Sequence, residues 1–287
     1  MSVIGLRPLP RLTQARAPLT CELGALNERG QLESVSIPAE RALTVYVDKR
    51  ELVTLMTLGA QPELLVLGFL RNQGLVKGVE EIESISVDWE VGAAAVKTRQ
   101  GISDIEQRTA KRVVTTGCGQ GSVFGDLMSQ VQSLVLPDAQ LSQTQLYAIV
   151  NSIRLADTTY KSAGSVHGCA LFQGAQRLIF VEDVGRHNAI DTIAGWMWMQ
   201  DPAMSGADKV FYTTGRLTSE MVIKSAQMGI PIVVSRSGIT QMGLEIARRL
   251  GLCAVGRAMN RRFLCYSGEK RLQFEPESVN LPTQNSD

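Results

Sequence analysis

The second half of the chain alternates between short apolar runs and longer amphipathic patterns. The runs predicted as strands are RLIFVEDVG (177–185), KVFYTTG (209–215), PIVVSRSG (231–238) and LCAVGR (252–257). The segments between them, at 186–200, 217–229 and 239–251, have helical patterns. Strands and helices that alternate at this length need crossover connections, which are right-handed and build a largely parallel sheet. We therefore predict an α/β fold here, with helices flanking a mostly parallel sheet.

The first half of the chain has a different rhythm. Two apolar runs within 41–58 are joined around an Asp-Lys pair, which predicts a β-hairpin. A short amphipathic helix is predicted between Pro62 and Gly74, because proline suits a first helical turn and glycine suits the position after the last. Further strands of an antiparallel sheet are predicted within 81–99. This half is therefore predicted to be α+β.

The best domain boundary lies near residue 136. Pro137 and the aspartate after it precede a long helical pattern, where the α+β rhythm gives way to the α/β rhythm. A chain of 287 residues is long enough for two ordinary domains, each with its own core. We predict a smaller N-terminal α+β domain at 1–136 and a C-terminal α/β domain at 137–287.

Charge and composition exclude several classes of protein. A formal net charge of +1 gives no overall attraction to nucleic acid or to acidic membranes. No run approaches the roughly 18 apolar residues of a membrane span, and the N-terminus lacks the apolar core of a secretory signal. The five cysteines are scattered and form no CxxC, which indicates a reduced compartment and no zinc site of that type. We expect a cytoplasmic protein with no bound metal of its own.

Glycine and arginine recur where the predicted strands end. The motifs are DVGR (183–186), TTGR (213–216), SRSG (235–238) and VGR (255–257), and NRR follows at 260–262. Ligands of open α/β sheets bind beyond the carboxyl ends of the strands, where helix N-termini favour anions and arginine offers a planar fork for phosphate. The pattern predicts a phosphate-bearing ligand, and a nucleotide is the expected one. The alternative is that glycine turns the chain and arginine faces water. Neither a P-loop nor a GxGxxG is present.

Charged residues also crowd the segment EDVGRHNAID, which contains Arg186 and His187. Such a cluster suits either a binding site or a helix start whose charges are satisfied locally. Both interpretations stay open at this stage.

The cysteines differ in their surroundings. Cys118 lies in VVTTGCGQGSVFGD, where three nearby glycines leave a thiol accessible, as a nucleophilic thiolate requires. An incidental loop cysteine is the alternative. Cys169 follows His167 by two residues, but a buried thiol is the simpler interpretation, and Cys253 and Cys265 lie in apolar runs typical of a core.

Taken together, TTGCG, VLGFLRNQGLV, HGCALF, VEDVGRHNAID, YTTGRLTSEMVIKSAQMGIPIVVSRSG and ARRLGLCAVGRAMNRR resemble the formate dehydrogenase accessory sulfurtransferase family, FdhD. The resemblance covers about residues 40–272. It implies a cytoplasmic sulfurtransferase that takes sulfur from a cysteine desulfurase as a persulfide on Cys118. The sulfur then passes to the molybdenum bis-molybdopterin guanine dinucleotide cofactor before that cofactor enters formate dehydrogenase. A cytidine-deaminase-like C-terminal domain and a homodimer are also implied.

The resemblance assigns site residues as well. The family's cofactor-binding stretch corresponds to Arg257, Ala258, Met259, Asn260, Arg261 and Arg262, and we add Arg216, Arg186 and His187 from the strand-end motifs. This agrees with the independent argument for guanidinium groups near phosphates.

Two features depart from the family pattern. Gly121 replaces the second cysteine of the family's CxxC, so no local dithiol can form, and the stretch at 257–262 is basic without the family's usual wording. A cofactor-binding carrier without sulfur transfer is therefore the second hypothesis. Deaminase chemistry is disfavoured, because the sequence contains neither the HxE nor the PCxxC that it needs.

Overall fold

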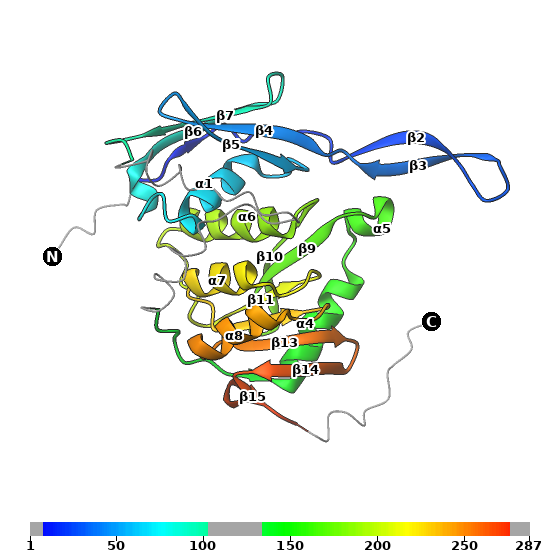
Figure 1. The fold of residues 1–287 in the computed structure, drawn as a ribbon, viewed down its shortest axis with the longest axis vertical. Helices are drawn as coiled ribbons and strands as arrows, with labels where there is room; N and C mark the ends of the chain where they lie inside the picture. Colours follow the sequence, from blue (N-terminus) through cyan, green and yellow to red (C-terminus); the bar gives the residue numbers. More distant parts are fainter. Residues whose placement is uncertain (1–7, 103–133, 276–287) are drawn as a thin grey trace. The chain divides into compact units, whose positions relative to one another are not determined.

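The computed structural model describes residues 8–102 and 134–275, which form two compact units (Figure 1). Of the described residues, 8–102, 157–169 and 181–204 belong to the first unit, and 134–156, 170–180 and 205–275 belong to the second. No helix within the described residues is long and apolar enough to cross a membrane. The described residues form a mixed arrangement of helices and sheets, in agreement with the predicted α/β class.

The first unit contains a five-stranded sheet in the order β1-β6-β7-β4-β5. Its strands are β1 (Arg11–Leu12), β4 (Arg41–Val47), β5 (Arg50–Thr57), β6 (Ile82–Asp88) and β7 (Ala93–Thr98), and a 3₁₀ turn, η1 (Val79–Glu81), leads into β6. The predicted β4–β5 hairpin is confirmed: Asp48 and Lys49 form its two-residue turn with φ of 46° and 73°, as such turns require. The antiparallel pairing of β6 with β7 is confirmed as well.

Two helices of the first unit pack directly on each other: α1 (Pro62–Asn72), at the predicted position, and α6 (Arg186–Met199). They touch through glycines. A Cβ added to Gly68 would lie 1.6 Å from the carbonyl oxygen of Asp191, and one added to Gly195 would lie 2.0 Å from that of Leu64. Only residues without a side chain allow the two backbones to come this close.

Polar contacts fasten the same pair of helices. Asn72 Nδ2 donates to Asp191 Oδ1 at 2.7 Å, and Arg71 Nη1 donates to the carbonyl of Ala194 at 2.9 Å. Burial lowers the pKa of Arg71 to about 10. α1 and α6 thus belong to one unit, although α6 lies beyond residue 136 in the chain.

The second unit holds most of a six-stranded sheet in the order β10-β9-β11-β12-β13-β14. The strands are β9 (His167–Gln173), β10 (Gln176–Asp183), β11 (Lys209–Thr213), β12 (Ile232–Ser235), β13 (Cys253–Met259) and β14 (Arg262–Ser267). The pairs β11–β12 and β12–β13 are parallel, as predicted, whereas β14 returns antiparallel to β13.

Helices and two short strands complete the second unit. The helices are α4 (Gln143–Leu155), α7 (Ser219–Gln227) and α8 (Gln241–Leu250). Ser142 caps α4, because its Oγ accepts from Gln145 N while the Gln145 side chain accepts from Ser142 N. The strands β8 (Leu141–Ser142) and β15 (Leu272–Gln273) pair in parallel, and η2 (Glu269–Arg271) precedes β15.

One element of the first unit was not predicted from the sequence. The strands β2 (Thr20–Leu26) and β3 (Leu32–Pro38) form a separate two-stranded ribbon. The short helix α5 (Thr159–Ala163) contacts β3 of this ribbon. The first hairpin predicted from the sequence begins at residue 41, and no strand is predicted before it.

Candidate functional site

Three neighbouring parallel strands of the second unit end in loops that carry arginine. Thr213 of β11 lies beside Ser235 of β12, and β13 follows in parallel register, so the three carboxyl ends share one edge of the sheet. Arg216 and Arg236 follow the ends of β11 and β12, whereas Arg257 lies within β13 near its carboxyl end, and all three side chains are exposed. We call this edge, with its loops at 213–218, 235–240 and 256–262, the arginine edge.

Backbone hydrogen bonds join the loops of the arginine edge. Arg236 N donates to the Thr213 carbonyl at 2.9 Å, and Arg257 N donates to the Ser237 carbonyl at 2.6 Å. Leu217 N donates to the Gly238 carbonyl at 2.9 Å. Neighbouring loops are thus fixed to one another, so the exposed guanidinium groups extend from a rigid backbone.

The chain is unusually constrained where Arg257 lies. Arg257 has φ of 51°, a left-handed conformation that residues other than glycine rarely adopt, and the pairing of β13 with β14 shifts register between Gly256 and Met259. A Cβ on Gly256 would lie 2.9 Å from the Ser237 carbonyl oxygen. Bulges and left-handed residues of this kind occur preferentially at functional sites, where they redirect a side chain.

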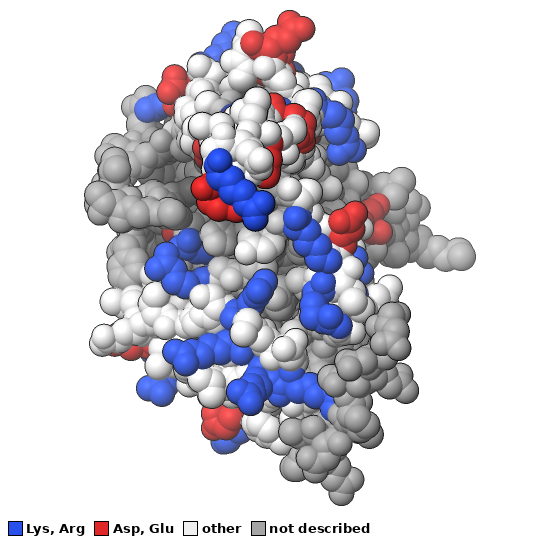
Figure 2. All heavy atoms as spheres, turned by 90° about the vertical axis from the view of Figure 1, so that its right-hand side faces the viewer, with Lys and Arg blue, Asp and Glu red and all other residues white. Residues whose placement is uncertain are grey.

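Two helices start at the same edge. Thr218 and Thr240 occupy the N-cap positions of α7 and α8, and the Thr240 hydroxyl accepts from Gly243 N at 3.2 Å. Helix N-termini carry partial positive charge and therefore favour anions. β13 ends toward the right-hand side of Figure 1, the side that faces the viewer in Figure 2, where Lys and Arg side chains gather with few acidic ones among them. Guanidinium groups and helix N-termini thus favour the same kind of ligand, an anion.

The residues of the predicted cofactor-binding stretch 257–262 differ in how far their side chains are exposed. Met259, Asn260 and Arg262 are exposed, whereas the Ala258 side chain is only 1% exposed and packs in the core of the second unit. Asn260 has φ of 53° and lies in the turn between β13 and β14, since Met259 pairs with Arg262. A ligand at this edge could therefore meet the side chains around Ala258 but only the backbone of Ala258 itself.

Arg186 and His187 belong to the first unit and are buried, with 6% and 3% of their surface exposed. They form the first turn of α6 after the N-cap Gly185. Of the strand-end arginines predicted to gather, the structure thus brings together Arg216, Arg236 and Arg257 within one unit. Cofactor binding by Arg186 and His187 stays a prediction.

The acidic part of EDVGRHNAID has a structural role. Asp183 is 3% exposed and accepts hydrogen bonds from Thr57 Oγ1 at 2.5 Å, Asn188 Nδ2 at 2.8 Å, Gly185 N at 3.1 Å and Leu58 N at 3.3 Å. Burial raises the pKa of Asp183, and these hydrogen bonds oppose the rise. The carboxylate joins the end of β5 to the start of α6, a contact across more than a hundred residues that the sequence did not reveal.

Comparison with known proteins identifies the family. The family model described as FdhD/NarQ matches residues 38–273, most of the chain. The chain belongs to the FdhD/NarQ family.

The similarity to relatives within the family extends over nearly the whole length of each relative. The sulfur carrier protein FdhD of Listeria monocytogenes serotype 4b (strain F2365) is 32% identical over 245 residues, which span 84% of this chain and 93% of that protein. The protein of the same name from Bacillus subtilis (strain 168) is 28% identical over 249 residues, 86% of this chain and 94% of that protein. A crystal structure described as a formate dehydrogenase accessory protein from Desulfotalea psychrophila matches with a TM-score of 0.72 and 26% identity, covering 89% of this chain and all of that one.

The thiol expected to carry sulfur in this FdhD/NarQ chain, Cys118, lies outside the described residues. Among the described cysteines, Cys169 and Cys253 are buried, as expected of core thiols, Cys265 is half-buried and Cys21 is exposed. The Cys169 thiol donates to the carbonyl of Arg186 at 3.9 Å. Within the described residues, no group of three His, Cys, Asp or Glu side chains could hold a metal ion.

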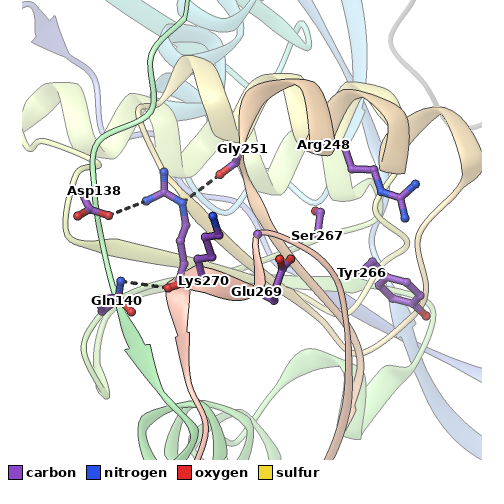
Figure 3. Close-up of a pocket in the computed structure, with 10 residues that line it drawn as sticks. Asp138, Gln140, Arg248, Gly251, Tyr266, Ser267, Glu269 and Lys270 are labelled. Atoms are coloured by element: carbon purple, nitrogen blue, oxygen red, sulfur yellow. Dashed lines mark hydrogen bonds and ion pairs between the residues drawn. The ribbon is translucent and has the colours of Figure 1, made fainter.

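A separate pocket of about 570 Å³ lies in the second unit beside the start of β13 and the end of β14, away from the arginine edge (Figure 3). Its most buried cation, Arg271, already donates to the carbonyls of Gly251 at 3.0 Å and Pro137 at 2.7 Å. Asp138 and Glu269 also line the pocket, and so does Gly251 at the C-terminus of α8. Carboxylates and a helix C-terminus both disfavour anions, so the arginine edge is the better candidate for a phosphate site.

Arg236 belongs to the SRSG motif but is not among the site residues predicted from the sequence. In the structure it directly follows β12, the middle strand of the three, and its backbone N donates to the carbonyl of Thr213 in β11. The signal was its position directly after a buried strand, the same phase that marked Arg216 and Arg257.

Proposed function

We propose that this chain is a sulfurtransferase that accepts sulfur from a cysteine desulfurase on Cys118. The sulfur goes to the molybdenum bis-molybdopterin guanine dinucleotide cofactor, which then enters formate dehydrogenase. Support comes from relatives named sulfur carrier protein and from a structural neighbour named as a formate dehydrogenase accessory protein. Cys118 is assigned from its motif, TTGCG, and from its glycine-rich surroundings.

The observation that carries the cofactor assignment is the arginine edge. A guanine dinucleotide brings diphosphate groups, and planar guanidinium groups bind phosphate oxygens with two hydrogen bonds each. Arg216, Arg236 and Arg257 are exposed on a rigid edge beside two helix N-termini, and Arg262 is exposed on the adjacent strand. This edge would hold the phosphates of the substrate while the loaded thiol approaches.

The sulfur step follows the rules of thiol-disulfide exchange. The Cys118 thiolate attacks the outer sulfur of the donor's cysteine persulfide, the S–S bond of the donor breaks, and the donor's thiolate leaves. Cys118 then holds a persulfide. Gly121 stands where many relatives have a second cysteine, so the loaded sulfur cannot be displaced by a thiol at that position. A single-thiol relay needs no such step.

We further propose a cytoplasmic homodimer that associates with the desulfurase and with formate dehydrogenase. The absence of the second cysteine also favours one alternative, a carrier that binds the finished cofactor and transfers no sulfur. The sulfurtransferase and the carrier differ in one testable respect, because only the sulfurtransferase gains sulfur on Cys118.

Sulfur loading can be measured directly by mass spectrometry. The full chain is incubated with an active cysteine desulfurase and cysteine, and its tryptic peptides are then mapped. We expect one added sulfur on the peptide that contains Cys118, while the peptide with the exposed Cys21 gains none. If the desulfurase turns over cysteine and the Cys118 peptide stays unmodified, the sulfurtransferase proposal is wrong and the carrier remains.

The arginine edge predicts a loss of nucleotide affinity on mutation. In the double variant Arg216→Ala, Arg257→Ala, we expect the affinity for GDP, used as a probe, to fall by about 100-fold or more, because each of the two lost charge-assisted hydrogen bonds is worth about 1.5–3 kcal/mol. Isothermal titration calorimetry measures this. Arg249→Ala is the matched control, since Arg249 is exposed in the last turn of α8. Equal affinities in all three proteins would exclude the arginine edge as the phosphate site.

A further inference from the structure

Two of the described thiols lie side by side in the second unit. Cys253 begins β13, and Cys265 lies on β14, directly opposite Val255. Because side chains alternate along a strand, Cys253 and Val255 point to the same face, which Cys265 shares. Cys253 and Val255 belong to the core of the second unit, and Cys265 packs against that core. The fold thus brings together two cysteines from different strands.

Hydrogen bonds arrange the two thiols in a fixed order. The Cys253 thiol donates to Cys265, and the Cys265 thiol donates in turn to the carbonyl oxygen of Ser267 at 3.3 Å. The hydrogen bond to Cys265 and burial both raise the pKa of Cys253. The hydrogen bond from Cys253 lowers the pKa of Cys265, although burial and the charge of Glu269 oppose this effect. Cys265 is therefore the first of the two thiols to ionise.

The two thiols also differ in their access to solvent. Cys253 is 0% exposed, whereas Cys265 is half-buried. The thiolate is the nucleophile in thiol chemistry, and a buried, protonated thiol is inert. A molecule from solvent can therefore react with Cys265 first. Cys253 can react only with a sulfur atom that is already bonded to Cys265.

We propose that Cys265 and Cys253 form a redox-active pair that reacts with low-molecular-weight disulfides, with Cys265 as the attacking thiol and Cys253 as the resolving thiol. This site uses neither Cys118 nor the arginine edge, so it goes beyond the proposed function. Gly121 leaves the chain without a CxxC, but the fold supplies a dithiol between two strands. In the reduced compartment that the sequence predicts, disulfides are transient and respond to oxidants. The pair therefore serves as a sensor of oxidised small thiols.

The reaction consists of two exchanges, written here for oxidised glutathione. The Cys265 thiolate attacks one sulfur atom, the S–S bond of glutathione breaks, and the first glutathione leaves as a thiolate, which takes up the proton that Cys265 released. Cys253 then attacks the Sγ of Cys265, and its proton goes to the second glutathione as that leaves. The protein pair is oxidised by two electrons to a disulfide. One oxidised glutathione is reduced to two molecules of reduced glutathione.

The position of β14 in its sheet allows this bond to close. β14 is the last strand of the six-stranded sheet, and among the described residues β13 is the one strand that pairs with it in this sheet. The pairing shifts register between Ala254 and Val255 and again between Gly256 and Met259. Such irregular pairing bends a strand locally. An edge strand of this kind can approach its neighbour without disturbing the other strand pairs of the sheet.

Peptide mapping of the full chain tests the pair. The reduced protein is treated with oxidised glutathione, its free thiols are alkylated, and the tryptic digest is analysed without reduction. Cys253 and Cys265 fall in separate tryptic peptides, LGLCAVGR and FLCYSGEK. We expect a disulfide between these two peptides in the single-chain band of a non-reducing gel. The buried Cys169 should stay unmodified, which shows that the chain remains folded during the reaction.

Variants separate the roles of the two thiols. In Cys253→Ala, Cys265 should keep the first glutathione as a mixed disulfide, because the resolving thiol is lost. In Cys265→Ala, Cys253 should stay unmodified, because it is buried. The matched control is Cys21→Ala, which removes an exposed thiol and should leave the link between the two peptides unchanged. Circular dichroism checks that the variants fold.

Two results would overturn the proposal. In the first, the exposed Cys21 forms a glutathione adduct while Cys253 and Cys265 both stay reduced, so the pair does not react. In the second, Cys265 of the unmodified chain keeps its glutathione, so Cys253 is not a resolving thiol. Both results come from the unmodified chain and hold even if a variant fails to fold. Sulfur loading of Cys118 is measured separately, so either proposal can fail alone.

Discussion

Replacement of Gly68 by alanine should destabilise the protein strongly, although it improves the helix locally. In the middle of α1, the helix propensity of alanine would add about 1 kcal/mol of stability. The new Cβ, however, would lie 1.6 Å from the carbonyl oxygen of Asp191 and 2.7 Å from Gly195 N, far below the roughly 3.4 Å of an ordinary contact. These are backbone atoms of a packed helix and cannot rotate away. We expect a net loss of about 3 kcal/mol in the free energy of unfolding.

Urea denaturation followed by circular dichroism measures this loss. Gly238→Ala is the matched control, because a Cβ there meets no atom within 4 Å. The sign of the change in the free energy of unfolding shows whether the helix propensity of alanine or the close approach of α6 dominates at Gly68. A stability equal to or above that of the unmodified protein would mean that α1 and α6 do not cross through these glycines.

Replacement of Cys118 by alanine should abolish the activation of formate dehydrogenase. If the thiol accepts the sulfur, no other group of the chain can replace it, and we expect activation to fall by more than about 100-fold. Nucleotide binding should be unchanged, because the arginine edge does not include Cys118. Activation is measured in cells or extracts that lack the native protein, alongside GDP binding by the purified variant.

The control for Cys118 is Cys21→Ala, which removes a thiol that is exposed in the described part of the chain. We expect this variant to activate formate dehydrogenase normally. Full activation by Cys118→Ala, together with loss of activation in Arg216→Ala, Arg257→Ala, would instead support the carrier that binds the cofactor without transferring sulfur.

Sequence patterns predicted the elements that depend mainly on residues close together in the chain. The β4–β5 hairpin follows from two apolar runs around Asp48–Lys49, and α1 follows from a proline and a glycine at the correct spacing. The ribbon of β2 and β3 was not predicted because, in the described structure, none of its strand residues is buried. Its sequence therefore lacks the apolar run that marks a buried strand. Exposed strands such as β2 and β3 can be identified from their hydrogen-bonded pairing, which is visible only in the structure.

The alternation of strands and helices, and the position of the arginines near the strand ends, can be read from the order of the residues alone. Parallel strands share one carboxyl edge, so this position alone brings Arg216, Arg236 and Arg257 together. Sequence also determined the family, through motifs spread along most of the chain.

Which segments share a core becomes visible only in the folded chain. α6 lies beyond the predicted boundary, yet it packs on α1, because Gly68 and Gly195 let two backbones meet that are over a hundred residues apart. The burial of Arg186 and Asp183 has the same origin, since both lie where α6 begins. Periodicity reports which side of an element is buried, but it carries no information about the distant partner that buries it.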